Sequence, residues 1–219
     1  ILDVGGESTR PGHQQITEDE EIQRVAPVIE AVKARFDVPV SIDTYKAKVA
    51  AAAIEAGADL VNDIWGLKYD PEMAGLIART GVACCLMHNK NNTEYQDFYP
   101  DMLRETAECV KLAKEAGIAD DKIILDPGVG FGKNYEQNLE TILHMERFHE
   151  LGYPMLLGTS RKSVIGLTLD LPADQRVEGT LVTTVMAVMK KYAFVRVHDI
   201  KENLRTIRMT EAILKAGEN

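Results

Sequence analysis

Cysteine is scarce in this sequence, with three in 219 residues. Cys84 and Cys85 are adjacent in the apolar run VACCLM and Cys109 lies apart from them, so the count is odd and the spacing is not that of a metal site. We expect all three to pack as small hydrophobic side chains, with no catalytic or metal-binding role. A reducing cytoplasm is the simplest compartment for such a chain.

Positive charge is also in short supply. Lys and Arg number 25 against 34 Asp and Glu, which gives a net charge of −9. Such a chain is poorly suited to binding a nucleic-acid backbone or an anionic membrane surface, and no apolar run approaches the ~20 residues that a membrane span requires. We therefore expect small-molecule substrates and neither a nucleic-acid nor a membrane partner. A local basic cluster would still accommodate an anionic substrate.

Linkers and low-complexity tracts are missing as well, so we expect a single domain over residues 1–219. One pattern repeats instead: a short apolar run, a polar or glycine-containing loop, and an amphipathic helix. The predicted strands are 1–4, 38–42, 59–61, 82–87, 122–125, 153–157 and 194–197, and the predicted helices are 17–36, 47–56, 72–80, 100–116, 135–151, 173–191 and 201–214. Thr17 and Glu20 form a candidate capping box for the first helix. Four glycines stand where helices should end: Gly57, Gly81, Gly117 and Gly152.

The number of strand–helix units indicates the fold. Because the strand runs are apolar on both faces, they are typical of parallel strands buried on both sides. Seven units are one short of a (β/α)₈ TIM barrel, and the chain falls about one unit below the ~250 residues typical of that fold. We expect an α/β protein with seven of the eight units of a TIM barrel, the N-terminal unit being absent. The alternative is an open, doubly wound sheet of seven strands, but no dinucleotide-type glycine loop follows the first strand.

Polar residues directly follow most of the predicted strands, where a barrel carries its functional face. Asp43, Asn62 and Asp126 are three of them. Two carboxylates and an amide suit a planar heterocycle with amino and amide edges, because they offer matching acceptors and donors. A ligand would also satisfy carboxylates whose burial is otherwise costly. The alternatives are a metal pair formed by the two carboxylates, or acceptors for neighbouring backbone N–H groups.

Arg196 and His198 belong to the last predicted strand. Residues two apart on a strand point the same way, so we expect these side chains to project together. A guanidinium and an imidazole suit phosphate oxygens, and Arg10 and Lys162 on neighbouring loops would complete a cationic cluster. The alternative is a surface ion pair between Arg196 and Asp199 with a solvated histidine.

Simpler roles account for other residues after the strands. Thr44, Asp63 and Asp199 stand where each could cap the helix that follows. The run 128–133 (GVGFGK) matches neither the Walker A motif nor the dinucleotide fingerprint, because the glycine spacing differs and no Ser or Thr follows the lysine. We interpret it as a tight loop.

Seven motifs, in one order along nearly the whole chain, together resemble dihydropteroate synthase. They are ILDVGGESTRPG (1–12), SIDTYK (41–46), NDI (62–64), LMH (86–88), DPGVGFGK (126–133), SRKS (160–163) and RVHD (196–199). The resemblance implies a barrel fold and a transferase of folate biosynthesis. In the implied reaction, the amine of p-aminobenzoate displaces the diphosphate of 6-hydroxymethyl-7,8-dihydropterin diphosphate to give 7,8-dihydropteroate.

The same resemblance implies roles for individual residues. The pterin ring would be held by Asp43, Asn62, Asp126 and Lys162. The diphosphate would be held by Arg196 and His198 with Mg²⁺, and these two with Asp126 and Lys162 would be the catalytic residues. The residues implied for p-aminobenzoate and sulfonamides are Thr9, Arg10, Pro11, Phe131 and Ser163, the first three in a mobile loop. A homodimer is implied as well.

One family motif is missing from the sequence. In the family, the first strand ends in Asn-x-Thr-Pro-Asp-Ser-Phe, whose Asn helps to bind Mg²⁺, so we expect no metal ligand within this chain. Two other barrels remain as alternatives. A folate-binding barrel of the corrinoid methyltransferase type would have no diphosphate to bind, which the SRKS and RVH motifs argue against. A Schiff-base aldolase would use Lys162 as its nucleophile and would need that lysine desolvated.

Overall fold

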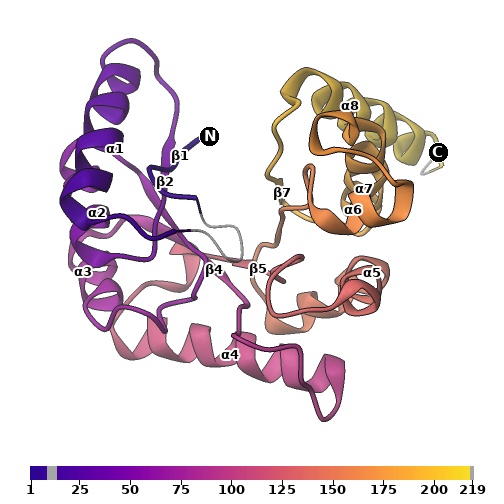
Figure 1. The fold of residues 1–219 in the computed structure, drawn as a ribbon, viewed down its shortest axis with the longest axis horizontal. Helices are drawn as coiled ribbons and strands as arrows, with labels where there is room; N and C mark the ends of the chain where they lie inside the picture. Colours follow the sequence, from indigo (N-terminus) through magenta and orange to yellow (C-terminus); the bar gives the residue numbers. More distant parts are fainter. Residues whose placement is uncertain (9–13, 218–219) are drawn as a thin grey trace. The chain divides into compact units, whose positions relative to one another are not determined.

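The computed structural model describes residues 1–8 and 14–217, in which strands and helices alternate (Figure 1). The strands are β1 (Leu2–Val4), β2 (Val40–Asp43), β3 (Leu60–Asp63), β4 (Ala83–Met87), β5 (Ile123–Asp126), β6 (Leu156–Leu157) and β7 (Phe194–Val195). The helices are α1 (Glu18–Lys33), α2 (Ala47–Glu55), α3 (Met73–Thr80), α4 (Phe98–Glu115), α5 (Tyr135–Leu143), α6 (Ser163–Leu169), α7 (Val177–Met189) and α8 (Ile200–Ala216). Within these ranges no helix combines the length and the apolar character that crossing a membrane requires.

All seven predicted strands are present at or near their expected positions, and the helices differ in three places. Helix α6 was not predicted, because a helix of 7 residues is too short for its periodicity to stand out. Residues 135–151 form two segments, since α5 ends at His144 and the chain continues as the 3₁₀ segment Met145–Leu151. Another 3₁₀ turn, Ala173–Gln175, precedes α7.

The chain divides into two compact units. Ile1–Asn89 and Arg104–Leu125 form the first unit, and Lys90–Leu103 and Asp126–Asn219 form the second. The organisation of residues 1–219 as one domain stays a prediction.

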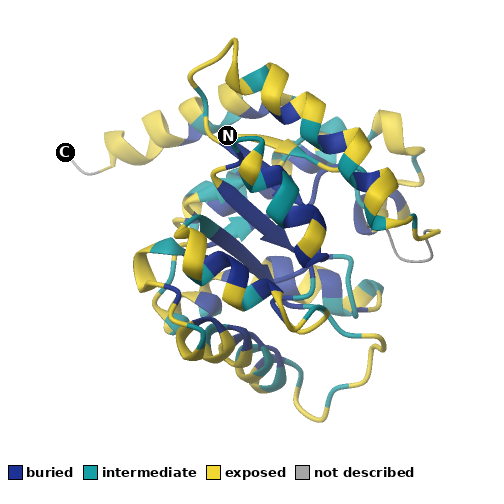
Figure 2. Ribbon diagram, turned by 90° about the vertical axis from the view of Figure 1, so that its left-hand side faces the viewer, coloured by how far each residue is buried: buried dark blue, intermediate teal, exposed yellow. Residues whose placement is uncertain are grey.

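The first unit is built on a sheet with strand order β1-β2-β3-β4-β5. Strands β1 to β4 pair in parallel, with Ile42, Val61 and Cys84 side by side in the register. These three side chains are fully buried, as expected for parallel strands covered on both faces. Figure 2 shows buried strands beside helices that are exposed along their outer sides.

The second unit has less sheet and more helix. Strands β6 and β7 pair in parallel through only two residues each, and α7 packs against α8. Helix α5 begins with a complete capping box, in which the side chains of Asn134 and Gln137 each accept from the other's backbone N–H. The capping box predicted at α1 is only half formed: Thr17 accepts from the Glu20 N–H at 3.2 Å.

All three cysteines are buried thiols, as the sequence predicts. Burial raises the pKa of Cys84 to about 12 and that of Cys109 to about 11. Both thiols therefore stay protonated near neutral pH and pack as apolar groups.

A buried ionic cluster joins the residues after β1 to α1 and to the start of α2. The ammonium of Lys46 donates to Glu7 at 2.7 Å and to Glu21 at 2.8 Å. Glu7 also accepts from the Tyr45 hydroxyl at 2.5 Å and from the Ile16 N–H at 2.8 Å. The Glu7 and Glu21 side chains are each 2% exposed, and that of Lys46 is 9% exposed. Lys46 therefore neutralises two carboxylates that would otherwise face each other in the core.

We predict that Lys46→Met lowers the free energy of unfolding by about 3–5 kcal/mol, because it leaves the buried carboxylates of Glu7 and Glu21 without a compensating positive charge. Denaturant melts at pH 7 measure this. Lys48→Met is the matched control, since Lys48 pairs with Asp19 at the exposed surface and should contribute little. Equal stability of the two variants would contradict the assignment of a structural role to the cluster.

Candidate active site

Asp43 and Asn62 form the part of the predicted pterin set that lies in the first unit. They are directly opposite each other in the β2–β3 register, so their side chains stand on the same face of the sheet. Only 5% of Asp43 and 7% of Asn62 is exposed. A Cβ at Gly5 would lie 3.4 Å from the Cβ of Asp43, so glycine lets the chain after β1 pass close to this carboxylate.

Two neighbouring polar residues have local structural roles. The Asp63 carboxylate accepts from the N–H groups of Trp65 and Leu67, each at 2.8 Å, so it caps the turn after β3 rather than a helix. Burial raises the pKa of Asp63 to about 6. His88, at the end of β4, places its Nε2 2.9 Å from a Glu105 oxygen on α4.

Asp126 is the buried carboxylate of the second unit. It ends β5, is 5% exposed, and accepts from the Gly128 N–H at 2.7 Å. Burial raises the pKa of Asp126 above its ordinary value, and the lowering effects of Lys162, the Gly128 N–H, Lys133 and Arg196 offset this only in part. An acceptor that is costly to ionise alone suits a ligand that brings its own donors.

Lys162 and Phe131 come together on the glycine loop 128–132. The Lys162 ammonium donates to the Val129 carbonyl and stands 4.6 Å from the centroid of the Phe131 ring. Ser163 follows as the first residue of α6 and is exposed. The structure thus brings Lys162, from the SRKS motif, together with Asp126 and Phe131, from the DPGVGFGK motif.

The geometry behind the predicted Arg196–His198 pair is different from the expected one. Strand β7 ends at Val195, so the alternation of side chains along a strand does not extend to these residues. A side-chain contact orients His198 instead: its Nδ1 lies 2.9 Å from the Ser160 hydroxyl. Arg196 is exposed, and its charge lowers the pKa of Asp126. The contact with Ser160 thus orients His198, whereas Arg196 acts on Asp126 through its charge.

Asp199 does not form the alternative ion pair with Arg196. Its carboxylate instead receives a two-pronged contact from Arg161, at 2.6 Å from Nη2 and 3.1 Å from Nε. Arg176 also holds this loop, because its guanidinium donates to the carbonyls of Arg161 and Lys162 at 3.0 and 3.3 Å. Sequence reasoning missed the role of Arg176. The corresponding feature of the sequence is Gly166, a glycine within α6. In the structure a Cβ at this position would lie 2.2 Å from the Arg176 guanidinium, so glycine leaves room for the Arg176 side chain.

Thr9, Arg10 and Pro11 lie outside the described residues. Their implied role with p-aminobenzoate stays a prediction.

The possible metal ligands of the described residues are their His, Cys, Asp and Glu side chains. Within residues 1–8 and 14–217, no three His, Cys, Asp or Glu side chains are grouped so that they could hold a metal ion. A requirement for Mg²⁺ stays an expectation from the family resemblance.

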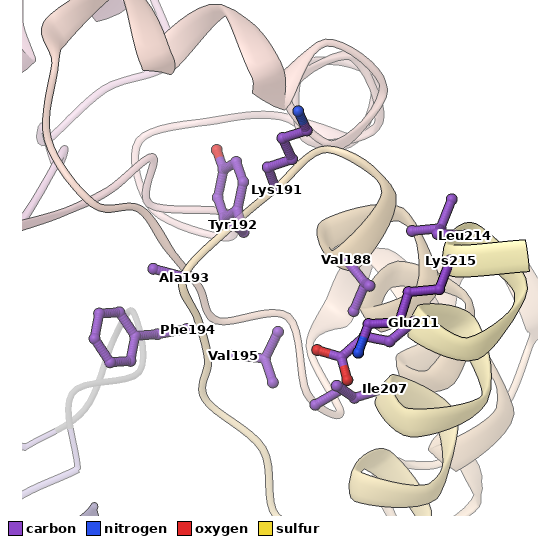
Figure 3. Close-up of a pocket in the computed structure, with 10 residues that line it drawn as sticks. All are labelled: Val188, Lys191, Tyr192, Ala193, Phe194, Val195, Ile207, Glu211, Leu214 and Lys215. Atoms are coloured by element: carbon purple, nitrogen blue, oxygen red, sulfur yellow. The ribbon is translucent and has the colours of Figure 1, made fainter. Parts of the chain in front are cut away.

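A cavity of about 380 Å³ lies in the second unit among α7, β7 and α8 (Figure 3). Its lining is largely apolar, with charged groups from Lys191, Glu211 and Lys215. None of the described candidate site residues lines it. It is therefore separate from the candidate site.

Comparison with known proteins identifies the family. A family model described as "Pterin binding enzyme" matches residues 1–198. A dihydropteroate synthase from Clostridium beijerinckii is 60% identical over 216 residues, covering 98% of this chain and 80% of that protein. The chain belongs to the dihydropteroate synthase family. A second relative in the family, from Bacillus subtilis, is 51% identical over 99% of this chain and 76% of its own length.

Solved structures of dihydropteroate synthases have the same fold as this chain. The Clostridium difficile enzyme, crystallised in the presence of pteroic acid, superposes with a TM-score of 0.94 at 48% identity, covering 96% of this chain and 81% of that one. The Yersinia pestis enzyme with a pterin–sulfa conjugate gives 0.93 at 41% identity, covering 97% and 82%. These neighbours confirm the TIM-barrel fold class over the open sheet. Together with the relatives, they confirm a dihydropteroate synthase, a transferase of folate biosynthesis, over the methyltransferase and aldolase alternatives.

The raised pKa of Asp126 predicts how this dihydropteroate synthase responds to losing the charge. Between the ordinary and the raised pKa, the folded state holds a proton that the unfolded chain has released, so stability falls as pH rises through that range. Asp126→Asn keeps an acceptor for the Gly128 N–H but removes the charge. We expect the unliganded variant to melt at a higher temperature than the wild type at pH 8, with the difference shrinking toward pH 4.

Thermal melts across this pH range measure the effect. Asp121→Asn, at an exposed position, is the matched control and should follow the wild type at every pH. A lower melting temperature for Asp126→Asn at pH 8 would contradict the prediction.

Proposed function

We propose that the candidate site residues carry out the dihydropteroate synthase reaction with the roles that the motifs imply. One observation carries the assignment: Lys162 of the SRKS motif meets Asp126 and Phe131 of the DPGVGFGK motif at the glycine loop. Related solved structures add support: the Clostridium difficile enzyme was crystallised in the presence of pteroic acid, the Yersinia pestis enzyme with a pterin–sulfa conjugate, and the Xanthomonas albilineans enzyme with 4-aminobenzoic acid.

Asp43, Asn62, Asp126 and Lys162 would hold the pterin. Carboxylates accept from the ring N–H and amino groups, and the amide of Asn62 matches an edge with both a donor and an acceptor. Ring donors would compensate the cost of keeping Asp126 ionised in its buried position. The negative charge of Asp126 would then favour the positive charge that develops on the exocyclic methylene.

The bond changes follow from that charge. The C–O bond between the methylene carbon and the diphosphate breaks, and its electron pair leaves on the diphosphate. The amine nitrogen of p-aminobenzoate forms the new C–N bond and loses one proton to solvent. Phe131 and Ser163, with Thr9, Arg10 and Pro11, would hold p-aminobenzoate against the pterin.

Arg196 and His198 would hold the departing diphosphate. Charge-assisted hydrogen bonds to its oxygens lower the free energy of the leaving group. The Ser160–His198 and Arg161–Asp199 contacts hold the two loops that carry these groups in fixed relation to each other. A requirement for Mg²⁺, which would supply further positive charge to the diphosphate, is carried by the family resemblance alone.

We predict that Asp126→Asn binds the pterin roughly 10–100-fold more weakly, because a hydrogen bond to a charged group is worth about 1.5–3 kcal/mol. Turnover should fall with it. Release of diphosphate that depends on p-aminobenzoate is the assay, with pterin affinity measured by calorimetry and Asp121→Asn as the control. Wild-type affinity and turnover in Asp126→Asn would contradict the assignment.

A homodimer located in the cytoplasm completes the proposal. The buried, reduced cysteines suit a reducing compartment. Support for the dimer comes from large apolar side chains that α7 and α8 expose. They include Val182, Met189, Met209 and Ile213, each about 60% exposed. Exposed apolar surface of this kind is typical of an interface between protein chains.

We predict that Val182→Lys converts the dimer to a monomer, because a buried unpaired charge is costly in an interface. Sedimentation equilibrium measures the mass. Val28→Lys is the matched control, since Val28 is also exposed but lies on α1. A wild-type protein that sediments as a monomer would contradict the dimer.

A further inference from the structure

The glycine loop between β5 and α5 has an unusual backbone. Gly128, Gly130 and Gly132 adopt φ values of 69°, 87° and 56°, so every second residue is in the left-handed region. Glycine reaches this region without steric cost but loses more conformational entropy on folding than any other residue. A loop built this way needs strong contacts to keep a single shape. Two buried side chains outside the substrate-binding set supply them.

The first is Lys133, which binds the loop from within. Its ammonium donates to the carbonyls of Gly128 and Phe131, both at 3.0 Å. The Gly128 carbonyl also accepts from the Phe131 N–H at 3.0 Å, which closes a tight turn around the ammonium. Lys133 is only 8% exposed. A buried ammonium is tolerated where such hydrogen bonds replace its hydration.

The second is Asn138, which ties the loop to the first turn of α5. Its side-chain oxygen accepts from the Gly130 N–H at 2.5 Å. Its amide donates to the carbonyls of Lys133 at 3.2 Å and Asn134 at 2.7 Å. Asn138 is 4% exposed. One amide therefore satisfies backbone groups on both sides of Phe131.

The loop shape determines where the Phe131 ring and the Lys162 ammonium lie. Lys162 donates to the Val129 carbonyl, and a Cβ at Gly130 would come within 3.1 Å of the Lys162 side chain. A change in the backbone of 128–132 would therefore move the ring and the ammonium together. We propose that Lys133 and Asn138 are positioning residues for p-aminobenzoate, an inference that rests on the proposed function. Neither makes contact with the reacting atoms; both act through the loop.

Two variants test this. Asn138→Ala removes the contacts to Gly130 and Lys133, and Lys133→Met removes those to Gly128 and Phe131. We expect each to raise the KM for p-aminobenzoate and the Ki of a sulfonamide about tenfold, the effect of losing about one buried hydrogen bond. Because Asn138 makes none of the charged contacts of Asp126, Asn138→Ala should leave the affinity for the pterin within about threefold of wild type.

Gln137→Ala is the matched control. Gln137 neighbours Asn138 on α5, and its substitution removes two hydrogen bonds, against three for Asn138→Ala. They join Gln137 to the Asn134 N–H and the Thr93 carbonyl, and neither partner is in the loop 128–132. It should lower the melting temperature while leaving the KM for p-aminobenzoate unchanged. Lys111→Met, at an exposed position on α4, controls for loss of a lysine.

The outcomes distinguish a failure of the positioning role from a failure of the proposed function. An active wild type in which Asn138→Ala and Gln137→Ala lower the melting temperature alike and leave KM unchanged would overturn the positioning role alone. A wild type without p-aminobenzoate-dependent release of diphosphate would overturn the proposed function and the positioning role with it. A rise in KM confined to Asn138→Ala and Lys133→Met would support both.

Discussion

The burial of negative charge at the ends of parallel strands is the constraint on which the rest of this structure depends. The carboxyl ends of parallel strands buried on both faces lie at one edge of the sheet, so polar residues at those ends become buried when the chain folds. Asp126 shows the result, because its burial raises the pKa even though cationic groups of the same unit act against the shift. A carboxylate kept in that condition is costly to ionise, and in the proposed function the donors of the pterin ring would offset that cost.

The same constraint is met differently where no ligand is required. Glu7 and Glu21 are as deeply buried, but Lys46 lies between them at hydrogen-bonding distance. Asp63 is satisfied by backbone N–H groups of its own turn. The contrast separates structural carboxylates from those of the site: the former have their donors built in, whereas Asp126 has one backbone donor and depends on long-range charge for the rest.

In the second unit, loops rather than strands hold the residues proposed to bind the diphosphate. With β6 and β7 only two residues long, register cannot orient residues 160–163 and 196–199. Side-chain pairs orient them: Ser160 with His198, and Arg161 with Asp199. The glycine loop follows the same principle through Lys133 and Asn138. In each case the residue that supports the loop lies in the same motif as a residue proposed to bind substrate, or in the helix that follows it.

The sequence by itself determined the order of strands and helices and the polar residues at the strand ends, because the period of apolar residues and the glycines at helix ends are local signals. It also placed Asp43, Asn62 and Asp126 at those ends. It did not reveal α6, which is too short for its periodicity to stand out, or the break at His144. It could not give the partner of Asp199, because Arg161 is 38 residues away along the chain. Only the tertiary structure decided that Asp199 pairs with Arg161, that His198 is oriented by Ser160, and that Lys133 lies inside its own loop. The physical reason is that hydrogen bonds between distant side chains depend on packing in three dimensions, which no local spacing encodes.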